Sequence, residues 1–434
     1  MQMNTVQISD RITLIQNKLF EQAHTQPLEL KFLAIAMNKQ GIKGEKLYSH
    51  PEIITLPTQG CEYLLSFNAH QKSILSAAFL ANFYKFVANS ESQTLISNVS
   101  VAEKIFVPYS DEYMILHQET SEELDHIWSF RTLHSMVCRE TGCPDLFDEP
   151  GFFFGNFRAI PQSDWQSLNT CFSFDNDRSE TLSLLLKGKN HLKKIVEKLQ
   201  NQDSNSIYRT LQFIVGDAVR MLPADKVQEN GLGSLWLLYR YVANVELKQA
   251  EAYLFDSPES FEYEPLAMEM NQAHLTDEAR HYTTSFDLGM ELYRKAPPEA
   301  QFFIRYCLQK VVEDYIQAAF ATYLEKLDKS QQGFVFTDVR IGLNALRMTL
   351  HHPELSDKQV NINELIHSWQ NISQYWRKVI GTIEQKTWRY KSQQIHRLIQ
   401  QLELDLNKNK LGNHYQRYQD CLETEELKRF IEVA

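Results

Sequence analysis

Two segments of this 434-residue chain repeat one pattern at an offset of 155, the difference between 246 and 91. LANFYKFVANSE (80–91) and LWLLYRYVANVE (235–246) share a leucine, a tyrosine and the string Val-Ala-Asn-x-Glu. The same offset places the Glu-x-x-His of EELDH (122–126) on the Glu-x-x-His of HLTDEARH (274–281). Two pairs of motifs that agree on one offset indicate a duplicated unit, which is far too long for a solenoid repeat.

Each half of the repeat has the spacing of a helical hairpin. In both halves 32 positions separate the lone glutamate from the glutamate of Glu-x-x-His, from 91 to 123 and from 246 to 278. This gap suits a helix that ends, turns and returns antiparallel past the same level. The residues four, seven and eleven before each lone glutamate are apolar or aromatic, so both glutamates continue a core-facing stripe. A carboxylate buried in such a stripe needs a compensating cation.

The rest of the chain also favours helices. Only 15 glycines and 13 prolines interrupt it, and long segments carry apolar residues at helical spacing. The strongest segments are 71–96, 112–139, 232–255, 265–295, 299–327 and 362–404, whereas TDVRIGL (337–343) alternates as a strand would. We predict an all-α fold with a four-helix bundle core, built from a duplicated helical hairpin plus additional helices.

Three regions follow from this pattern. We predict an N-terminal helical and loop extension over 1–70 and a helical C-terminal extension over 328–434, packed on the bundle. The bundle itself occupies 71–327 and contains an inserted connection at about 140–230, which begins near the breaker cluster GCPDLFDEPG.

Charge and hydropathy exclude several classes of partner. A net charge of −11 disfavours nucleic acid and anionic membranes. Asp10 and Arg11 interrupt the N-terminal segment where a signal peptide needs an apolar core. No apolar run has the length of a membrane span. We therefore expect a cytoplasmic protein that acts on a small molecule, with no nucleic-acid or membrane partner, and a homodimer is compatible with the sequence.

The repeated residues predict a metal site. Glu and His at i and i+3 lie on one side of a helix, carboxylates can bridge two cations, and imidazole nitrogen suits iron. Two Glu-x-x-His helices and two lone-Glu helices form the carboxylate-bridged di-iron pattern of helix bundles. We expect two iron ions, with manganese as the alternative metal. The candidate ligands are Glu91, Glu123, His126, Glu246, Glu278 and His281.

His274 is a seventh candidate ligand. It stands four residues before Glu278 on the same helical face, and its counterpart in the first half is Glu119. One ion of the pair would therefore be richer in nitrogen. Glu119 itself is expected to be an outer or surface residue, whereas Asp125 and Asp277 are candidates to orient the imidazoles or are simply exposed.

These motifs resemble the p-aminobenzoate N-oxygenase family of non-heme di-iron oxygenases, over roughly residues 70–295. The resemblance implies a ferritin-like bundle, all seven candidate residues as ligands, and a monooxygenase that uses O2 to insert oxygen into an amine nitrogen. It implies an electron donor, which would be a ferredoxin, a flavoprotein or peroxide, and no catalytic residue beyond the ligands. The chain departs from the family in its longer connection between the halves and its longer C-terminal tail, which leaves the substrate open.

Two alternatives share the same ligand set. One is a di-iron hydroxylase or desaturase that acts on a carrier-bound or lipid-like substrate. The other is a non-catalytic iron-binding protein, or a scaffold with a vestigial site. The ligand residues alone do not separate these alternatives from N-oxygenation.

Overall fold

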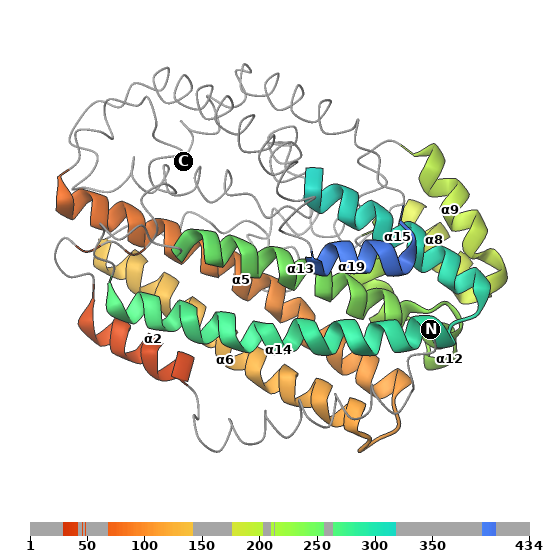
Figure 1. The fold of residues 1–434 in the computed structure, drawn as a ribbon, viewed down its shortest axis with the longest axis horizontal. Coiled ribbons are helices and arrows are strands. Elements are labelled where there is room, and N and C mark those ends of the chain that lie inside the picture. Colours follow the sequence, from red (N-terminus) through yellow and green to blue (C-terminus); the bar gives the residue numbers. More distant parts are fainter. Residues whose placement is uncertain are drawn as a thin grey trace, which may run out of the picture.

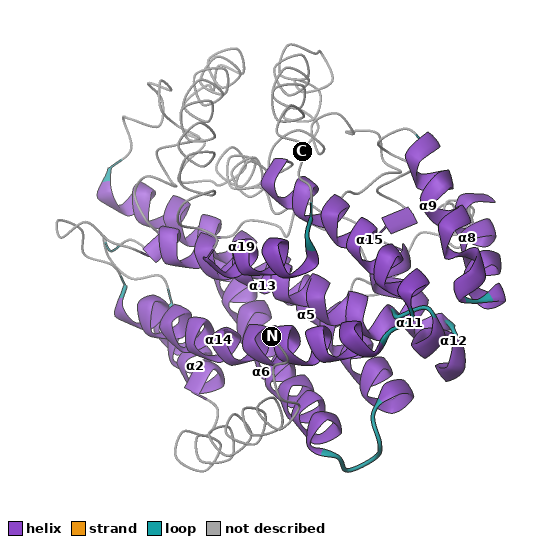
Figure 2. Ribbon diagram, turned by 45° about the vertical axis from the view of Figure 1, so that its right-hand side comes forward, coloured by secondary structure: helices purple, strands orange, loops and turns teal. Residues whose placement is uncertain are grey.

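The structure, a computed structural model, describes residues 29–41, 46, 48, 68–141, 176–202, 210–211, 213–255, 264–317 and 393–404. Within these ranges every regular element is a helix and no strand occurs (Figure 2). The prediction of an all-α fold is therefore confirmed for the described residues. The strand-like stretch at 337–343 lies outside them.

Four long helices form the centre of the protein. They are α5 (Ala69–Ile105), α6 (Asp111–Thr141), α13 (Leu232–Phe255) and α14 (Pro265–Lys295). The predicted ranges for α13 and α14 are confirmed, but α5 continues nine residues past the predicted end at 96. It does so because neither glycine nor proline occurs between 97 and 107, so the first breaker is Pro108 in the following turn.

Local sequence signals set the ends of these helices. The Asn68 side chain accepts a hydrogen bond from the Gln71 backbone N–H, and the Gln71 side chain accepts one from the Asn68 backbone N–H, which makes a capping box for α5. Helix α14 has proline at its first position and is capped by the Glu264 side chain. It ends at Lys295, just before the Pro297-Pro298 pair.

The four helices pair as two hairpins. α5 packs along α6 and α13 packs along α14, and the two pairs meet through α5 with α13 and α6 with α14 (Figure 1). Gly289 of α14 permits close approach to α13, because a Cβ there would stand 2.8 Å from Leu238 Cγ. The predicted bundle of two duplicated hairpins is confirmed.

Further helices cover this bundle. α2 (Glu29–Gln40) lies against α6 and α14, and α15 (Pro298–Gln317) lies against α13. α19 (Gln393–Leu402) contacts α13 from far along the chain (Figure 1). The connection between the hairpins is largely helical where it is described: α8 (Asn176–Lys187), η3 (Lys189–His191), α9 (Leu192–Asn201), the π-helix η4 (Phe213–Asp217), α11 (Ala218–Met221) and α12 (Ala224–Glu229).

A lysine fixes this connection to the bundle. The Lys104 ammonium, near the end of α5, donates to the backbone carbonyls of Val219, Arg220 and Leu222 at 2.6–2.8 Å. These carbonyls lie at the carboxyl end of α11, where the intrahelical acceptors have no donors of their own. The contact holds the short helix beside α5, so the connection is anchored next to the first hairpin.

The remaining predictions about the ends of the chain stay predictions. Most of the proposed extensions at 1–70 and 328–434 lies outside the described residues, so their boundaries and packing are not decided. Among the helices that the structure describes, none combines the length and the hydropathy needed to cross a membrane.

Candidate metal centre

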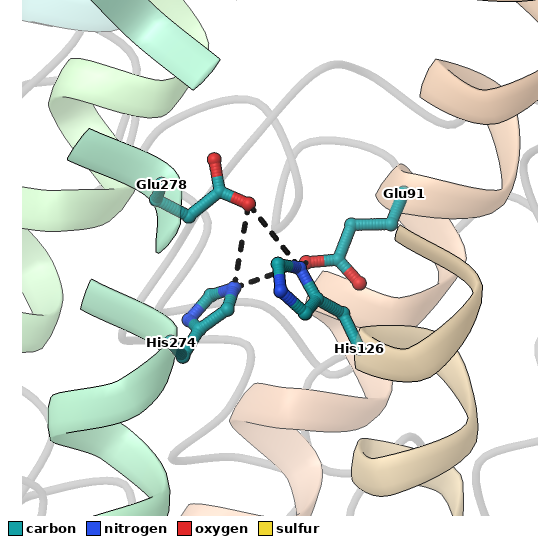
Figure 3. A group of neighbouring side chains, drawn as sticks. All are labelled: Glu91, His126, His274 and Glu278. Carbon is teal, nitrogen blue, oxygen red and sulfur yellow. Dashed lines mark hydrogen bonds and ion pairs between the residues drawn. The ribbon is translucent and has the colours of Figure 1, made fainter. Parts of the chain in front are cut away.

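Six of the seven predicted ligands come together inside the bundle. Glu91, His126, His274 and Glu278 form one group, and Glu123, Glu278 and His281 form a second, all of them buried. Within each group the potential ligand atoms lie within 4.8 Å of one another. Figure 3 shows the first group, whose side chains converge from three helices. Glu278 belongs to both groups. The site therefore offers two adjacent positions for ions, and these positions share the Glu278 carboxylate.

The hairpins deliver these side chains to one level. Glu91 comes from α5, and the Glu-x-x-His pair at 123 and 126 comes from α6. α14 presents three residues at i, i+4 and i+7, which stand above one another on a single helical face. The seventh candidate, Glu246, lies on α13, the fourth helix of the bundle, but its side chain is outside the described part.

Glu123 and Glu278 lie between two imidazoles. His126 Nδ1 is 3.2 Å from Glu123 Oε2 and 3.4 Å from Glu278 Oε1. His281 Nδ1 is 3.2 Å from Glu123 Oε1 and 3.3 Å from Glu278 Oε1. Two ligands that each stand about 2.1 Å from one ion are roughly 3–3.5 Å apart. These contacts therefore have the spacing of ligand atoms around cations, and both glutamates are in place to bridge them.

His274 adds a second imidazole to the group that contains Glu91. Its Nε2 is 3.1 Å from Glu91 Oε1 and 3.6 Å from Glu278 Oε1. The edge of the ring packs against Phe130, with centroids 4.7 Å apart. Tyr84 stacks on Phe130 and is also perpendicular to the His274 ring, with centroids 6.0 Å apart. Aromatic packing thus fixes the orientation of His274 before any ion binds.

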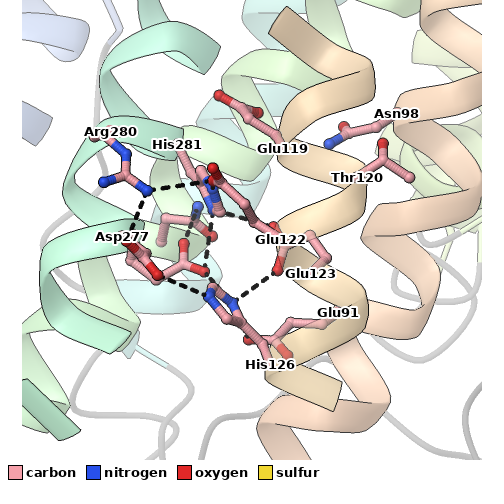
Figure 4. A network of polar contacts seen from close by, with 12 residues as sticks. Glu91, Asn98, Glu119, Thr120, Glu122, Glu123, His126, Asp277, Arg280 and His281 are labelled. Atoms are coloured by element: carbon pink, nitrogen blue, oxygen red, sulfur yellow. Dashed lines mark hydrogen bonds and ion pairs between the residues drawn. The ribbon is translucent and has the colours of Figure 1, made fainter. Parts of the chain in front are cut away.

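Two outer carboxylates hold the imidazoles reciprocally (Figure 4). The Nε2 of His281 on α14 is 2.8 Å from Glu122 Oε2 on α6. The Nε2 of His126 on α6 is 3.5 Å from Asp277 Oδ2 on α14. Because the Nε2 atoms of His126 and His281 contact outer carboxylates, their Nδ1 atoms face the centre and are the nitrogens available to a metal. Arg280 joins the pair, with Nη2 at 2.6 Å from Asp277 and 3.4 Å from Glu122.

The sequence indicated only one of these two outer residues. Asp277 was a candidate either to orient an imidazole or to be simply exposed, and it contacts His126. Asp125 was the other candidate, but the contact to His281 comes from Glu122. The repeat accounts for this contact, because Glu122 directly precedes the ligand glutamate of the first half, as Asp277 does in the second half at the offset of 155. The repeat could have identified Glu122.

Arg240 was missed entirely by the sequence patterns. It is buried on α13 beside the site, where its Nη2 donates to Glu123 Oε1 at 2.7 Å. Its Nη1 donates to Glu119 Oε2 and, at 3.3 Å, to Ser285 Oγ. From sequence alone, an arginine on a helix is expected to be exposed to solvent. The repeat counterpart of Arg240 in the first half, Lys85, is also basic.

In the metal-free protein, protonated imidazoles balance the charge of the buried carboxylates. Burial alone would lower the pKa of His126, but the surrounding Asp277, Glu123 and Glu278 carboxylates raise it well above 6.5. His281 behaves in the same way, with Glu278 and Glu123 as the main opposing charges. Burial would raise the pKa of Glu278, but His281 and the other imidazoles hold it well below 4.5.

The donor set fits a pair of divalent cations. The buried Glu91 Oε2 has no hydrogen-bond partner among the described residues, which leaves a ligand atom free on an inward-facing carboxylate. Carboxylate oxygens and imidazole nitrogens are the ligands that iron and manganese take in proteins. An ion at either position would replace the protons that the imidazoles otherwise carry.

The outer carboxylates yield a testable prediction. Changing Glu122 to Gln or Asp277 to Asn should weaken metal binding by about 10–100-fold, because each change removes the negative charge that supports one ligand imidazole. Metal titration of the two variants measures the effect. Glu112→Gln, at a half-buried position in the first turn of α6, is the matched control and should bind metal as the wild type does. Unchanged affinity in both variants would contradict the assigned role.

Comparison with known proteins adds one match. A family model described as "Acyl halogenase CylC-like" matches residues 65–340. This range includes both hairpins and every candidate ligand. No curated protein and no solved structure was found to match the chain.

Proposed function

This chain belongs to the CylC-like acyl halogenase family, and from that membership we propose an O2-dependent, non-heme di-iron enzyme that oxidises a carbon of an acyl chain. Its proposed reaction is halogenation. The family model matches residues 65–340, which is more than half of the chain. The word acyl in the family description favours carbon as the reacting atom over the amine nitrogen that the N-oxygenase resemblance implies.

The observation that carries the proposal is the sharing of Glu278 by two groups of potential ligands. A single structural ion would need only one such group. Two groups joined by a carboxylate suit a pair of ions close enough to act on one O2 molecule. The proposed ligands are Glu91, Glu123, His126, His274, Glu278 and His281 from the described side chains, together with Glu246 from α13.

Bound iron would supply the reduction of O2 and the oxidising power that removes a hydrogen atom from carbon. In the overall reaction a carbon–hydrogen bond is replaced by a carbon–halogen bond and O2 is reduced to two waters. The halide, protons and two electrons from an external donor are consumed.

The chain's own residues provide the geometry for this chemistry. Glu122 and Asp277 fix the two imidazoles, and the Asn244 amide donates to Glu278 Oε2 at 2.7 Å, which orients the shared carboxylate. Phe130 packs against His274 and contributes an apolar wall that keeps water from this side of the site. These contacts hold the side chains from outside the ligand set, so they support the geometry that the ions would need.

The direct test is an activity assay with iron-loaded protein. The protein is reduced, exposed to O2 with chloride or bromide, and offered a carrier-bound acyl chain, an acyl thioester, a free fatty acid and an arylamine. The proposal expects mass spectrometry to detect halogen in place of hydrogen on an acyl substrate. A hydroxylated or desaturated acyl chain would support the hydroxylase or desaturase alternative, and oxygen on the arylamine nitrogen would overturn the proposed substrate class. Manganese-loaded protein run in parallel tests the metal.

The pKa shifts predict how the metal-free protein depends on pH. The raised pKa values of His126 and His281 give stability that is fully present below pH 6.5 and is lost as pH rises through their folded-state values. The lowered pKa of Glu278 gives stability that is present above pH 4.5 and is lost in acid. Metal-free protein should therefore be most stable at mildly acidic pH and lose stability toward alkaline pH.

Bound metal should reverse the alkaline part of this trend. The ions need neutral imidazoles, so binding releases protons and strengthens as pH rises. Urea unfolding of metal-free and loaded protein at about pH 6 and about pH 9 measures both effects. Metal-free protein that is equally stable at both values would contradict the assignment of protons to His126 and His281.

A further inference from the structure

The repeat leaves one pair of positions that the two halves use differently. Six of the candidate ligands form three pairs of identical residues at the offset of 155: Glu91 with Glu246, Glu123 with Glu278, and His126 with His281. The fourth position holds His274 in the second half and Glu119 in the first. His274 contacts Glu91 across the bundle. By the symmetry of the repeat, its counterpart Glu119 would reach the group formed by Glu123, Glu278 and His281.

Glu119 has the placement of such a ligand. It is fully buried on α6, one helical turn before Glu123 and on the same face. It lies close enough to His281 for their charges to interact. Figure 4 shows its carboxylate on the side of α6 that faces the network. A buried carboxylate one helical turn from a ligand glutamate is a natural candidate for the ligand set.

The partner of the Glu119 carboxylate is the Arg240 side chain. Its guanidinium donates from Nη1 to Glu119 Oε2 and from Nη2 to Glu123 Oε1. It therefore bridges two carboxylates that lie one turn apart on α6. The other oxygen of Glu119, Oε1, has no hydrogen-bond partner among the described residues. An arginine is charged at every accessible pH and donates from a rigid fork, so it holds both carboxylates in fixed positions.

We propose that Arg240 is a positioning residue that keeps Glu119 out of the ligand set at the position formed by Glu123, Glu278 and His281. That position then has one protein ligand fewer than the position that includes Glu91 and His274. An ion held by Glu123, Glu278 and His281 would therefore keep a coordination site open for a small external ligand, such as O2 or a halide. This inference rests on the proposed dimetal function and specifies which of the two ions meets the external ligand.

Glu119→Gln is the first test, because glutamine can still accept a hydrogen bond from Arg240 and the fold should be retained. Anaerobic titration with Fe²⁺, and with Co²⁺ as a spectroscopic probe, counts the ions and measures both affinities. We expect two ions, each bound within about tenfold of its wild-type affinity, which is less than loss of an outer partner usually costs. If Glu119 were a ligand, the second ion would be lost, and the proposal would be overturned.

Arg240→Met is the second test. The visible absorption of bound Co²⁺ in this variant reports how many ligands the second ion has. The change releases Glu119, so the second Co²⁺ should gain a ligand, bind more tightly and absorb more weakly in the visible range. The double variant Arg240→Met/Glu119→Leu removes both partners and should restore the wild-type spectrum. The same spectrum in Arg240→Met as in the wild type would overturn the proposal. If Arg240→Met does not fold, the double variant and Glu119→Gln together decide the question.

Lys85→Met is the matched control, since Lys85 is the repeat counterpart of Arg240 and is only half-buried on α5. It should leave the affinity and spectrum of both ions unchanged. Failure of the inference is distinct from failure of the dimetal function. Wild-type protein that binds fewer than two ions would remove the proposed function itself. Wild-type protein that binds two ions, with Glu119→Gln binding only one, would remove the inference alone.

Discussion

Replacing Glu278 with glutamine is expected to reduce bound metal from about two ions per chain to fewer than about one and to abolish oxidation of the substrate. Glu278 Oε1 lies 3.3 Å from His281 Nδ1, 3.4 Å from His126 Nδ1 and 3.6 Å from His274 Nε2. It is the one residue that both ligand groups share. A neutral amide cannot supply the anionic oxygen that both positions use, so both ions are affected together.

Metal analysis of purified, iron-loaded protein measures this result. Glu91→Gln makes a graded comparison, because Glu91 belongs to one group only and its replacement should cost one ion. Glu269→Gln, on the exposed face of the same helix, is the matched control and should retain both ions and full activity. Two tightly bound ions in Glu278→Gln would contradict the shared role of this carboxylate.

Replacing Arg240 with methionine is expected to lower the free energy of unfolding of the metal-free protein by about 3–5 kcal/mol. The guanidinium is buried and contacts two carboxylates that are themselves buried, Glu119 and Glu123. Without it, these charges lose their strongest donor in a region that water does not reach. Burial lowers the pKa of Arg240, but the Glu119, Glu123 and Glu278 carboxylates outweigh it and raise the pKa above its ordinary value, so the group stays charged.

Urea denaturation of metal-free protein measures the loss. Lys85→Met, at the counterpart position, should cost less than about 1 kcal/mol, as exposed or half-exposed charges usually do. Arg240→Met/Glu119→Leu should recover part of the stability, because it removes a buried charge together with its partner. Equal stability of Arg240→Met and the wild type would show that water or another cation reaches these carboxylates.

The ligand residues could be predicted because they repeat. Glu123 and Glu278 stand at matched positions of two helical hairpins, and helical geometry brings residues at i and i+3 to one face wherever the helices pack. The ends of α13 and α14 were predictable for a similar reason, since glycine and proline clusters bound them. Whether the Glu246 side chain joins the site stays a prediction, because that side chain lies outside the described residues.

Arg240 and Glu122 could not be predicted with the same ease. A charged residue on a helix is normally solvated, and only the packing of α13 against α6 and α14 turns Arg240 toward buried carboxylates. The substrate class was also not contained in the ligand pattern, because N-oxygenation and acyl oxidation use the same ligand types. The proposal of an acyl substrate rests on the family to which the chain belongs.

The sequence by itself determined the all-α class, the duplicated hairpin and a set of acidic and imidazole ligands at matched spacing. These follow from periodicity along a single helix, which is a local property of the chain. Only the tertiary structure decided that Glu278 is shared by two groups of ligands and that Arg240 forms an ion pair with Glu119. It also decided that Glu122 contacts His281 and that Asp277 contacts His126, each across the α6–α14 interface. Those facts depend on which faces of different helices meet, and the packing of four helices decides that, not the spacing within any one of them.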